Sequence, residues 1–174
     1  PYILVTDKRI TDGRELIPLL EKIAPLGIPL LIVAEGIESD VLGLLVENKL
    51  RGKLNTVAVH PPAYGEGRVA MMEDLALLTG GVFFSETTGN SDLRDATPEM
   101  LGRAANVRIE RSNTILSGCA GKTEDIEKRV RYLEILHERS KYDFDRKQLT
   151  ERIARLGRGV AVIEVGAPTV IEMK

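Results

Sequence analysis

The sequence predicts a single α/β domain in which helices cover a largely parallel β-sheet. Two observations lead to this prediction. Over residues 2–84, short apolar runs of strand length alternate with longer segments of helical character, the order typical of parallel strands joined by helices. The chain has 174 residues, 43% of them hydrophobic and 29% charged, which suits one globular domain.

The elements of the first half follow from local signals. Four strands are predicted as apolar runs, at residues 2–6, 28–34, 55–59 and 82–84. Three helices are predicted between them, at residues 12–26, 38–51 and 66–79. Asp12 and Glu15 have the spacing of a capping box, which places a helix start there, and Gly27 is a typical helix end.

The second half is less regular but still has signals for strands and helices. Thr97 before Pro98 predicts a short helix. Further elements are a hairpin of residues 107–110 and 114–116, a charged helix of residues 123–141, a helix of residues 145–156 and a last strand of residues 160–165. Thr123 is the expected N-cap of the charged helix, and Asp145 begins the next one with capping-box spacing.

Charge and composition exclude several classes of protein. The net charge of −2 and the absence of a run of Lys or Arg argue against a nucleic-acid partner. No apolar stretch approaches the length of a membrane span, so we expect no membrane partner. A single cysteine, Cys119, rules out an internal disulfide, and we expect a reduced, cytoplasmic protein. The sequence begins and ends within strand-like runs, which we interpret as cuts in a longer chain.

Candidate catalytic groups are few. Gly121-Lys122-Thr123 lies between a predicted strand and a predicted helix, as a phosphate-binding P-loop does, but Leu116 stands where that pattern requires glycine. A nucleotide-binding enzyme domain using these three residues remains the alternative function, with a simple turn as the competing interpretation. No histidine can be placed beside Cys119 from sequence, and we predict no catalytic residue, cofactor or metal ligand.

The helices at 12–26 and 38–51 are more informative because they are more apolar than docking on a sheet requires. Their apolar positions are 16, 17, 19, 20, 23 and 24 in the first and 41, 42, 44, 45, 46 and 50 in the second. These cover about half the circumference or more, whereas a docked helix needs an apolar stripe of only about 100°. Either another element covers the surplus, or it forms an exposed groove that binds protein.

Long collinear segments resemble the apical domain of bacterial group I chaperonins of the GroEL type. They are residues 14–21, 29–35, 44–52, 74–81, 142–152 and 159–167. This resemblance implies an α/β fold with a mixed β-sheet core flanked by helices, two parallel apolar helices forming a binding groove, and a C-terminal helical pair. It covers residues 1–174 as one domain without the first segment of the apical domain and without the equatorial ATPase domain.

The resemblance also implies a function: capture of non-native polypeptides and of the mobile loop of a co-chaperonin. The positions that would bind them are Ile17, Leu20, Leu42, Val46, Glu47 and Asn48. ATP and Mg²⁺ are expected only for the full-length protein, which is expected to form a homo-oligomeric ring, whereas this chain alone is expected to be a monomer without enzymatic activity.

Two departures from the family pattern affect these expectations. Glu47 stands where the family usually has an apolar contact residue, and an unpaired carboxylate resists burial. We therefore expect partner choice to be narrower or shifted toward basic segments. Val170 replaces an acidic residue that the family uses in an inter-subunit salt bridge, which puts that ring contact in doubt.

Overall fold

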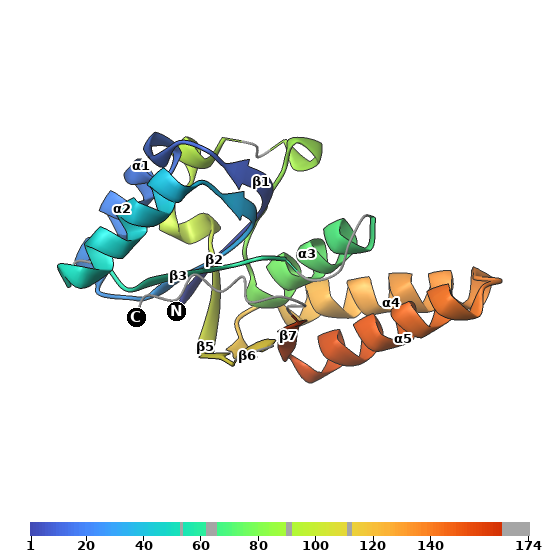
Figure 1. Ribbon diagram of the computed structural model, residues 1–174. Helices are drawn as coiled ribbons and strands as arrows, with labels where there is room; N and C mark the ends of the chain where they lie inside the picture. The colour runs from blue at the N-terminus through green and yellow to red at the C-terminus, as the bar shows by residue number, and fades with distance from the viewer. Residues whose placement is uncertain (53, 62–65, 90–91, 111–112, 165–174) are drawn as a thin grey trace.

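A computed structural model describes residues 1–52, 54–61, 66–89, 92–110 and 113–164. Within this part, one sheet has the strand order β3-β2-β1-β5-β6-β7, and β4 lies beside β1 (Figure 1). The strands are β1 Tyr2–Ile10, β2 Leu30–Ile37, β3 Thr56–Val59, β4 Phe83–Phe84, β5 Gly102–Ile109, β6 Asn113–Cys119 and β7 Ala161–Glu164. Residue 165 of the predicted strand at 160–165 therefore lies outside the described residues, and so does Val170.

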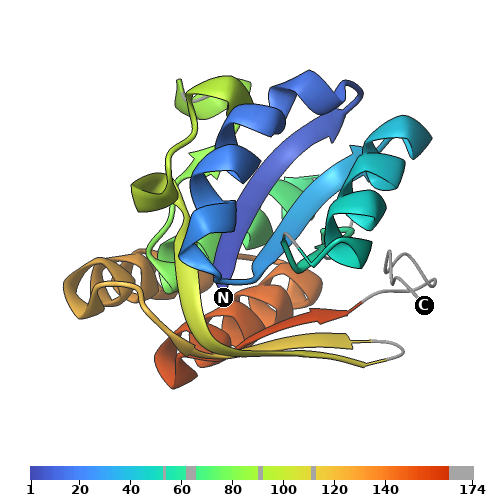
Figure 2. The same ribbon diagram turned by 90° about the vertical axis from the view of Figure 1, so that its left-hand side faces the viewer.

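The first half of the sheet is parallel, as the strand-helix alternation predicts. β1 pairs in parallel with β2 and with β4, and β2 pairs in parallel with β3. Parallel crossovers are right-handed. The steps from β1 to β2 to β3 therefore place α1 (Ile17–Ile23) and α2 (Ser39–Leu50) on one face. The step back to β4 places α3 (Glu66–Thr79) on the other face (Figure 2).

The second half of the sheet is antiparallel, so the sheet as a whole is mixed. β5 pairs with β1 through two residue pairs and then forms a hairpin with β6, and β6 pairs with β7. The hairpin strands are longer than the predicted segments 107–110 and 114–116. Much of β5 is exposed, so its first residues lack the continuous apolar signal that marks a buried strand.

The two faces of the sheet carry separate hydrophobic cores. Alternate residues of β1 and β2 point to opposite faces. Leu4 and Ile32 pack with α1 and α2, whereas Val5 and Val33 pack with α3, α4 (Thr123–Arg139), α5 (Asp143–Arg158) and β7. Each helix layer is therefore tied to the sheet through its own apolar cluster.

The predicted helix at 12–26 is divided into three pieces. A 3₁₀ turn, η1 (Gly13–Glu15), precedes α1, and a second one, η2 (Ala24–Leu26), follows it. Asp12 caps η1 by accepting a hydrogen bond from the Arg14 N–H at 2.9 Å. Pro25 cannot donate the backbone hydrogen bond that would continue an α-helix, and Gly27 ends the segment at φ 67°.

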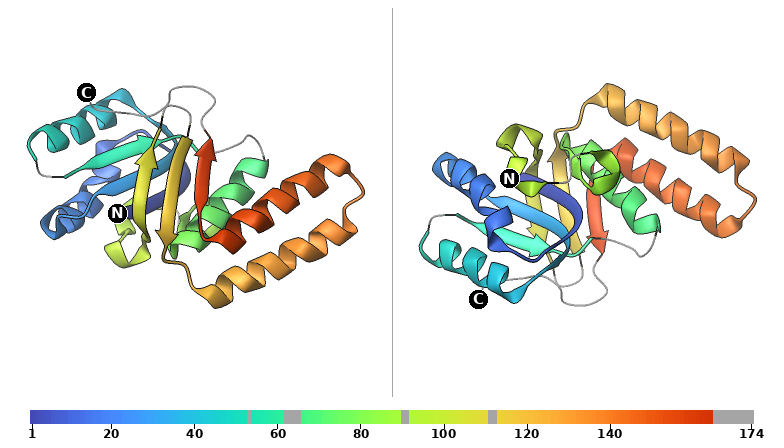
Figure 3. Two further views of the ribbon diagram at one scale, coloured as in Figure 1. Left: turned by 90° about the horizontal axis from the view of Figure 1, so that it is seen from below. Right: turned by 90° about the horizontal axis from the view of Figure 1, so that it is seen from above.

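α4 and α5 form a helical hairpin that projects from the body of the domain (Figure 3). The expectation that Thr123 caps α4 is wrong, because Thr123 is the first helical residue and Lys122 is the N-cap, without a side-chain hydrogen bond. The prediction that α5 starts at Asp145 is also wrong. The helix begins at Asp143, so its first turn holds two acidic residues, Asp143 and Asp145, whose negative charges interact favourably with the positive end of the helix dipole.

A buried carboxylate fastens this hairpin to α3. Asp74 accepts hydrogen bonds from Arg129 of α4 at 3.0 Å and from Arg152 of α5 at 2.5 and 2.9 Å. Arg129 also donates to Glu73 at 3.1 Å. Burial alone lowers the pKa of Arg129, but Asp74 and Glu73 outweigh burial, so the net shift of that pKa is upward. The three helices are thus held by directional, charge-assisted hydrogen bonds.

Candidate functional site

The candidate binding surface lies on α1 and α2, which share one face of the sheet (Figure 2). Both helices return the chain from the carboxyl ends of parallel strands to the start of the next strand, so they run in the same direction. Each uses an apolar stripe to reach the core. The remaining apolar positions determine what the surface offers to a partner.

On α1, only one of the two predicted contact residues is accessible. Ile17 is 37% exposed, but Leu20 is 6% exposed and belongs to the core. The expectation that Leu20 lies on an exposed flank is therefore wrong. Leu16, Leu19, Leu20 and Ile23 form the inward stripe, and the segment that contains Leu93 packs against the same core and covers that flank.

On α2, the predicted contact residues are partly accessible. Val41 and Leu45 are buried, one turn apart, and hold the helix on the sheet. Leu42, Val46 and Asn48 are intermediate in exposure, and Glu47 is exposed. Leu42 and Val46 are themselves one turn apart, so they continue along a second stripe beside the buried one.

The structure adds two exposed leucines that the sequence analysis did not single out as contacts. Leu26 at the end of η2 is 50% exposed, and Leu50 at the end of α2 is 73% exposed. Leu50 was counted among the apolar positions of its helix, but periodicity does not tell which flank another element covers. We define the α1–α2 surface by five of its accessible apolar residues, Ile17, Leu26, Leu42, Val46 and Leu50.

Glu47 has a partner within its own helix. Its carboxylate lies 2.5 Å from the Arg51 guanidinium, four residues along α2, and both side chains are more than half exposed. The pair is electrically neutral as a unit. Glu47 therefore does not present an unpaired negative charge, and the reason to expect that it selects basic segments no longer holds.

The Gly121-Lys122-Thr123 segment has a packing role in this fold. The Gly121 N–H donates to the Leu78 carbonyl at 2.8 Å, so it is already engaged by the end of α3. A Cβ at Gly121 would lie 2.4 Å from the carbonyl oxygens of Leu77 and Leu78. Glycine is therefore required here by close backbone approach, and the geometry does not favour the alternative of a phosphate-binding loop.

Cys119 lies in surroundings that do not activate a nucleophile. Burial raises the pKa of the Cys119 thiol, which disfavours the thiolate that a nucleophile needs. Among the described residues, no group of three or more His, Cys, Asp or Glu side chains is placed to hold a metal ion. None of the described helices has the length and apolarity to cross a membrane.

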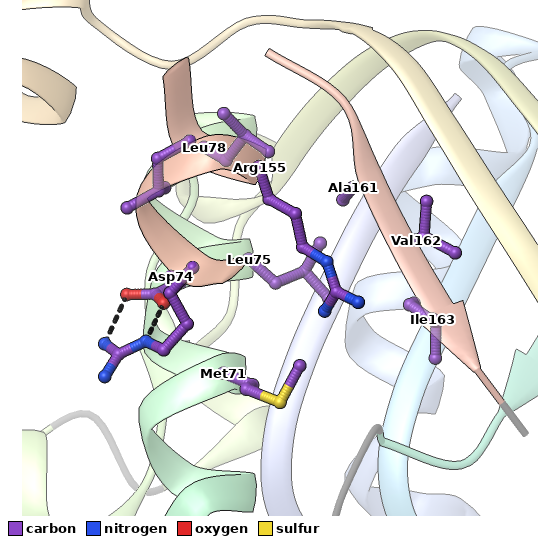
Figure 4. Close-up of a pocket in the computed structure, with 10 residues that line it drawn as sticks. Met71, Asp74, Leu75, Leu78, Arg155, Ala161, Val162 and Ile163 are labelled. Carbon is purple, nitrogen blue, oxygen red and sulfur yellow. Dashed lines mark hydrogen bonds and ion pairs between the residues drawn. The ribbon is translucent and has the colours of Figure 1, made fainter. Parts of the chain in front are cut away.

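A small pocket between α3, α5 and β7 is shown in Figure 4. Its walls are mainly apolar, with Leu75 and Ile163 on opposite sides and the ion pair of Asp74 and Arg152 at one end. The open space is about 40 Å³, little more than a water molecule occupies. We therefore assign it to the packing of the hairpin rather than to ligand binding.

The mixed sheet, the flanking helices and the C-terminal helix pair form an α/β fold that resembles part of a solved chaperonin. A solved structure of similar fold is the chaperonin gp146 from bacteriophage EL 2 (Pseudomonas aeruginosa), with a TM-score of 0.56 and 17% sequence identity. The match covers 96% of this chain and 33% of that one, so this chain spans about a third of the length of the chaperonin. No known protein-family model matches the sequence.

Proposed function

We propose that this chain is the polypeptide-binding, apical domain of a chaperonin. The observation that carries the proposal is the α1–α2 surface: accessible apolar residues on two neighbouring helices of a chaperonin-like fold. Apolar burial is non-directional and depends on area, so such a surface accepts many sequences. Non-native polypeptides and the mobile loop of a co-chaperonin are the proposed partners.

The proposal assigns different roles to the residues on the two helices. Ile17, Leu42 and Val46 contact the bound segment, and Asn48 offers a polar group beside them. Leu20 is buried, so it supports the surface from below and shapes it without being the first point of contact. Glu47, paired with Arg51, forms a neutral polar rim.

For the full-length protein, we propose a homo-oligomeric ring whose ATPase site lies outside these residues. The matched chaperonin is about three times as long as this chain, which leaves room for further domains. ATP and Mg²⁺ would then act on binding through movement of this domain as a body.

The test is suppression of aggregation of a guanidinium-denatured enzyme, followed by light scattering. We expect the wild-type chain to suppress scattering and Leu42→Ser/Val46→Ser to require about thirtyfold more protein, because each partly exposed anchor contributes about 1 kcal/mol when fully buried. The control is Tyr132→Ser/Ile135→Ser, which removes exposed apolar side chains from α4 instead. Equal activity of the folded α2 variant and wild type would refute the proposal.

A further inference from the structure

Gly43 lies in the interior of α2, where glycine lowers the stability of a helix. It is the fifth of the twelve residues of α2, so it caps neither end of the helix. Glycine loses more backbone freedom than alanine when it becomes helical, and it has no side chain that could pack. A glycine at such a position therefore calls for a structural or a functional reason.

Neither the backbone nor the packing of the described residues requires glycine at this position. Gly43 is not one of the glycines with positive φ, and its helical backbone suits any residue. Among the described residues, no atom would lie within 4 Å of a Cβ at Gly43, whereas a Cβ at Gly81 or Gly121 would collide with backbone atoms. Gly157 is equally open, but it lies in the last turn of α5, where helices fray.

Gly43 is surrounded by the accessible apolar residues of α2. Val46 and Leu50 follow it by three and seven residues, a spacing that places all three positions on one face of the helix. Leu42 and Val46 are partly exposed, and Leu50 is 73% exposed. Gly43 therefore leaves an open space on the α1–α2 surface that apolar side chains border, and we call this space the Gly43 notch.

The side chain best placed to cover the notch is engaged elsewhere. Glu47 lies one turn after Gly43, and side chains of an α-helix lean toward its N-terminus, so an unpaired Glu47 would lean over the glycine. Its carboxylate instead lies 2.5 Å from the guanidinium of Arg51, one turn further toward the C-terminus. On the other side of the notch, one turn before Gly43, stands Ser39, whose side chain is short. The notch is therefore open along the helix as well as outward.

We propose that Gly43 sets a preference for aromatic residues in the bound polypeptide, because the notch admits a large ring. This preference rests on the proposed function and adds a substrate class to it, namely segments that present an aromatic side chain. An aromatic ring buries about 150–250 Å² at a low cost in side-chain entropy. Because the ring is flat, it can lie against the bare turn at Gly43 while it contacts Leu42 and Val46. A methyl group at position 43 would hold the ring away from the helix.

The test uses fluorescence anisotropy and two labelled peptides that are identical except for phenylalanine or alanine at one central position between two leucines. We expect the 174-residue wild-type chain to bind the phenylalanine peptide about tenfold more tightly. Gly43→Ala should weaken binding of the phenylalanine peptide about fivefold and change binding of the alanine peptide by less than about twofold. The same substitution should raise the equilibrium constant of folding about fivefold in urea denaturation, so lost binding would not reflect unfolding.

Gly157→Ala is the matched control, because it makes the same change at an open helical position of α5 and should leave both affinities unchanged. Equal effects of Gly43→Ala on the two peptides, or equal affinity of wild type for both, would overturn the role of Gly43 and leave the proposed function standing. Lower stability of Gly43→Ala would also overturn it, because the glycine would then serve packing. If wild type bound neither peptide, the proposed function would fail, and the preference with it.

Discussion

The two faces of the sheet hold their helices by different means. α1 and α2 rest on the sheet through apolar side chains such as Leu19 and Val41, whereas α3, α4 and α5 are also joined to one another by the buried carboxylate of Asp74. Apolar contact is non-directional, but a carboxylate shared by two arginines fixes relative orientation. The α1 and α2 layer therefore keeps apolar side chains accessible, whereas the relative orientation of α3, α4 and α5 is fixed by hydrogen bonds.

Exposure of apolar side chains alone does not distinguish the two layers. The hairpin also exposes large side chains, namely Tyr132, Ile135, Tyr142 and Phe144. What differs is their support: α1 and α2 each lie against the sheet along an inward stripe, whereas α4 and α5 reach the core through Leu133, Leu149 and Leu156 but together project from the body. The variants below change one layer at a time, beginning with the largest expected effect on the free energy of unfolding.

Asp74→Asn should destabilise the α3–α5 layer most. The substitution leaves Arg129 and Arg152 without their buried counter-charge, and breaking a buried pair costs about 3–5 kcal/mol. Chemical denaturation measures this change. Glu73→Gln is the matched control, since Glu73 is more exposed and its loss should cost under about 1 kcal/mol. Equal losses for the two variants would show that burial of the Asp74 cluster is unimportant.

Leu20→Ala should have the next largest effect, on the other layer. Truncating a buried leucine costs about 2–5 kcal/mol through lost burial and the cavity left behind. Ile17→Ala, on the same helix, should cost less because Ile17 is 37% exposed. Thermal unfolding compares the two variants. A smaller loss for Leu20→Ala than for Ile17→Ala would contradict the assignment of Leu20 to the core.

The contrast between Ile17 and Leu20 shows how much of the fold and site could be predicted from sequence. Strand-helix alternation predicted the parallel strands and their helices, because period and turn signals are local. The flank that becomes covered depends on a distant segment: Leu93 lies more than seventy residues from Leu20 yet packs into the same core. Patterning alone allowed both a covered flank and an exposed one, and both occur on α1.

The contact between Asp7 and Ser85 illustrates a second limit of sequence patterns. Asp7 and Ser85 are 78 residues apart, and no local motif joins them. Their contact depends on β4 pairing with β1 rather than extending the sheet beyond β3. Sequence predicted both strands, but not their order in the sheet, so the contact between the polar groups at their ends could not be predicted.

Gly121→Ala tests the connection between the two halves of the sheet and should have an intermediate effect. The added methyl group would meet two backbone carbonyl oxygens at the end of α3, and overpacking of this kind costs about 1–3 kcal/mol. Urea denaturation measures the loss. Gly157→Ala is the control, because a Cβ there meets nothing within 4 Å. An unchanged midpoint for Gly121→Ala would reopen the phosphate-loop interpretation of this segment.

Arg51→Gln should have the smallest effect on stability, because exposed ion pairs contribute under about 1 kcal/mol. This variant is useful for comparing partners, because the substitution leaves Glu47 charged and unpaired at the rim of the α1–α2 surface. Binding of a basic apolar peptide should then strengthen relative to an acidic one, as fluorescence anisotropy measures. The preference should diminish with added salt, because exposed charges are screened. If the ratio of the two affinities is the same as in wild type, Glu47 is too far from the bound segment to influence partner choice.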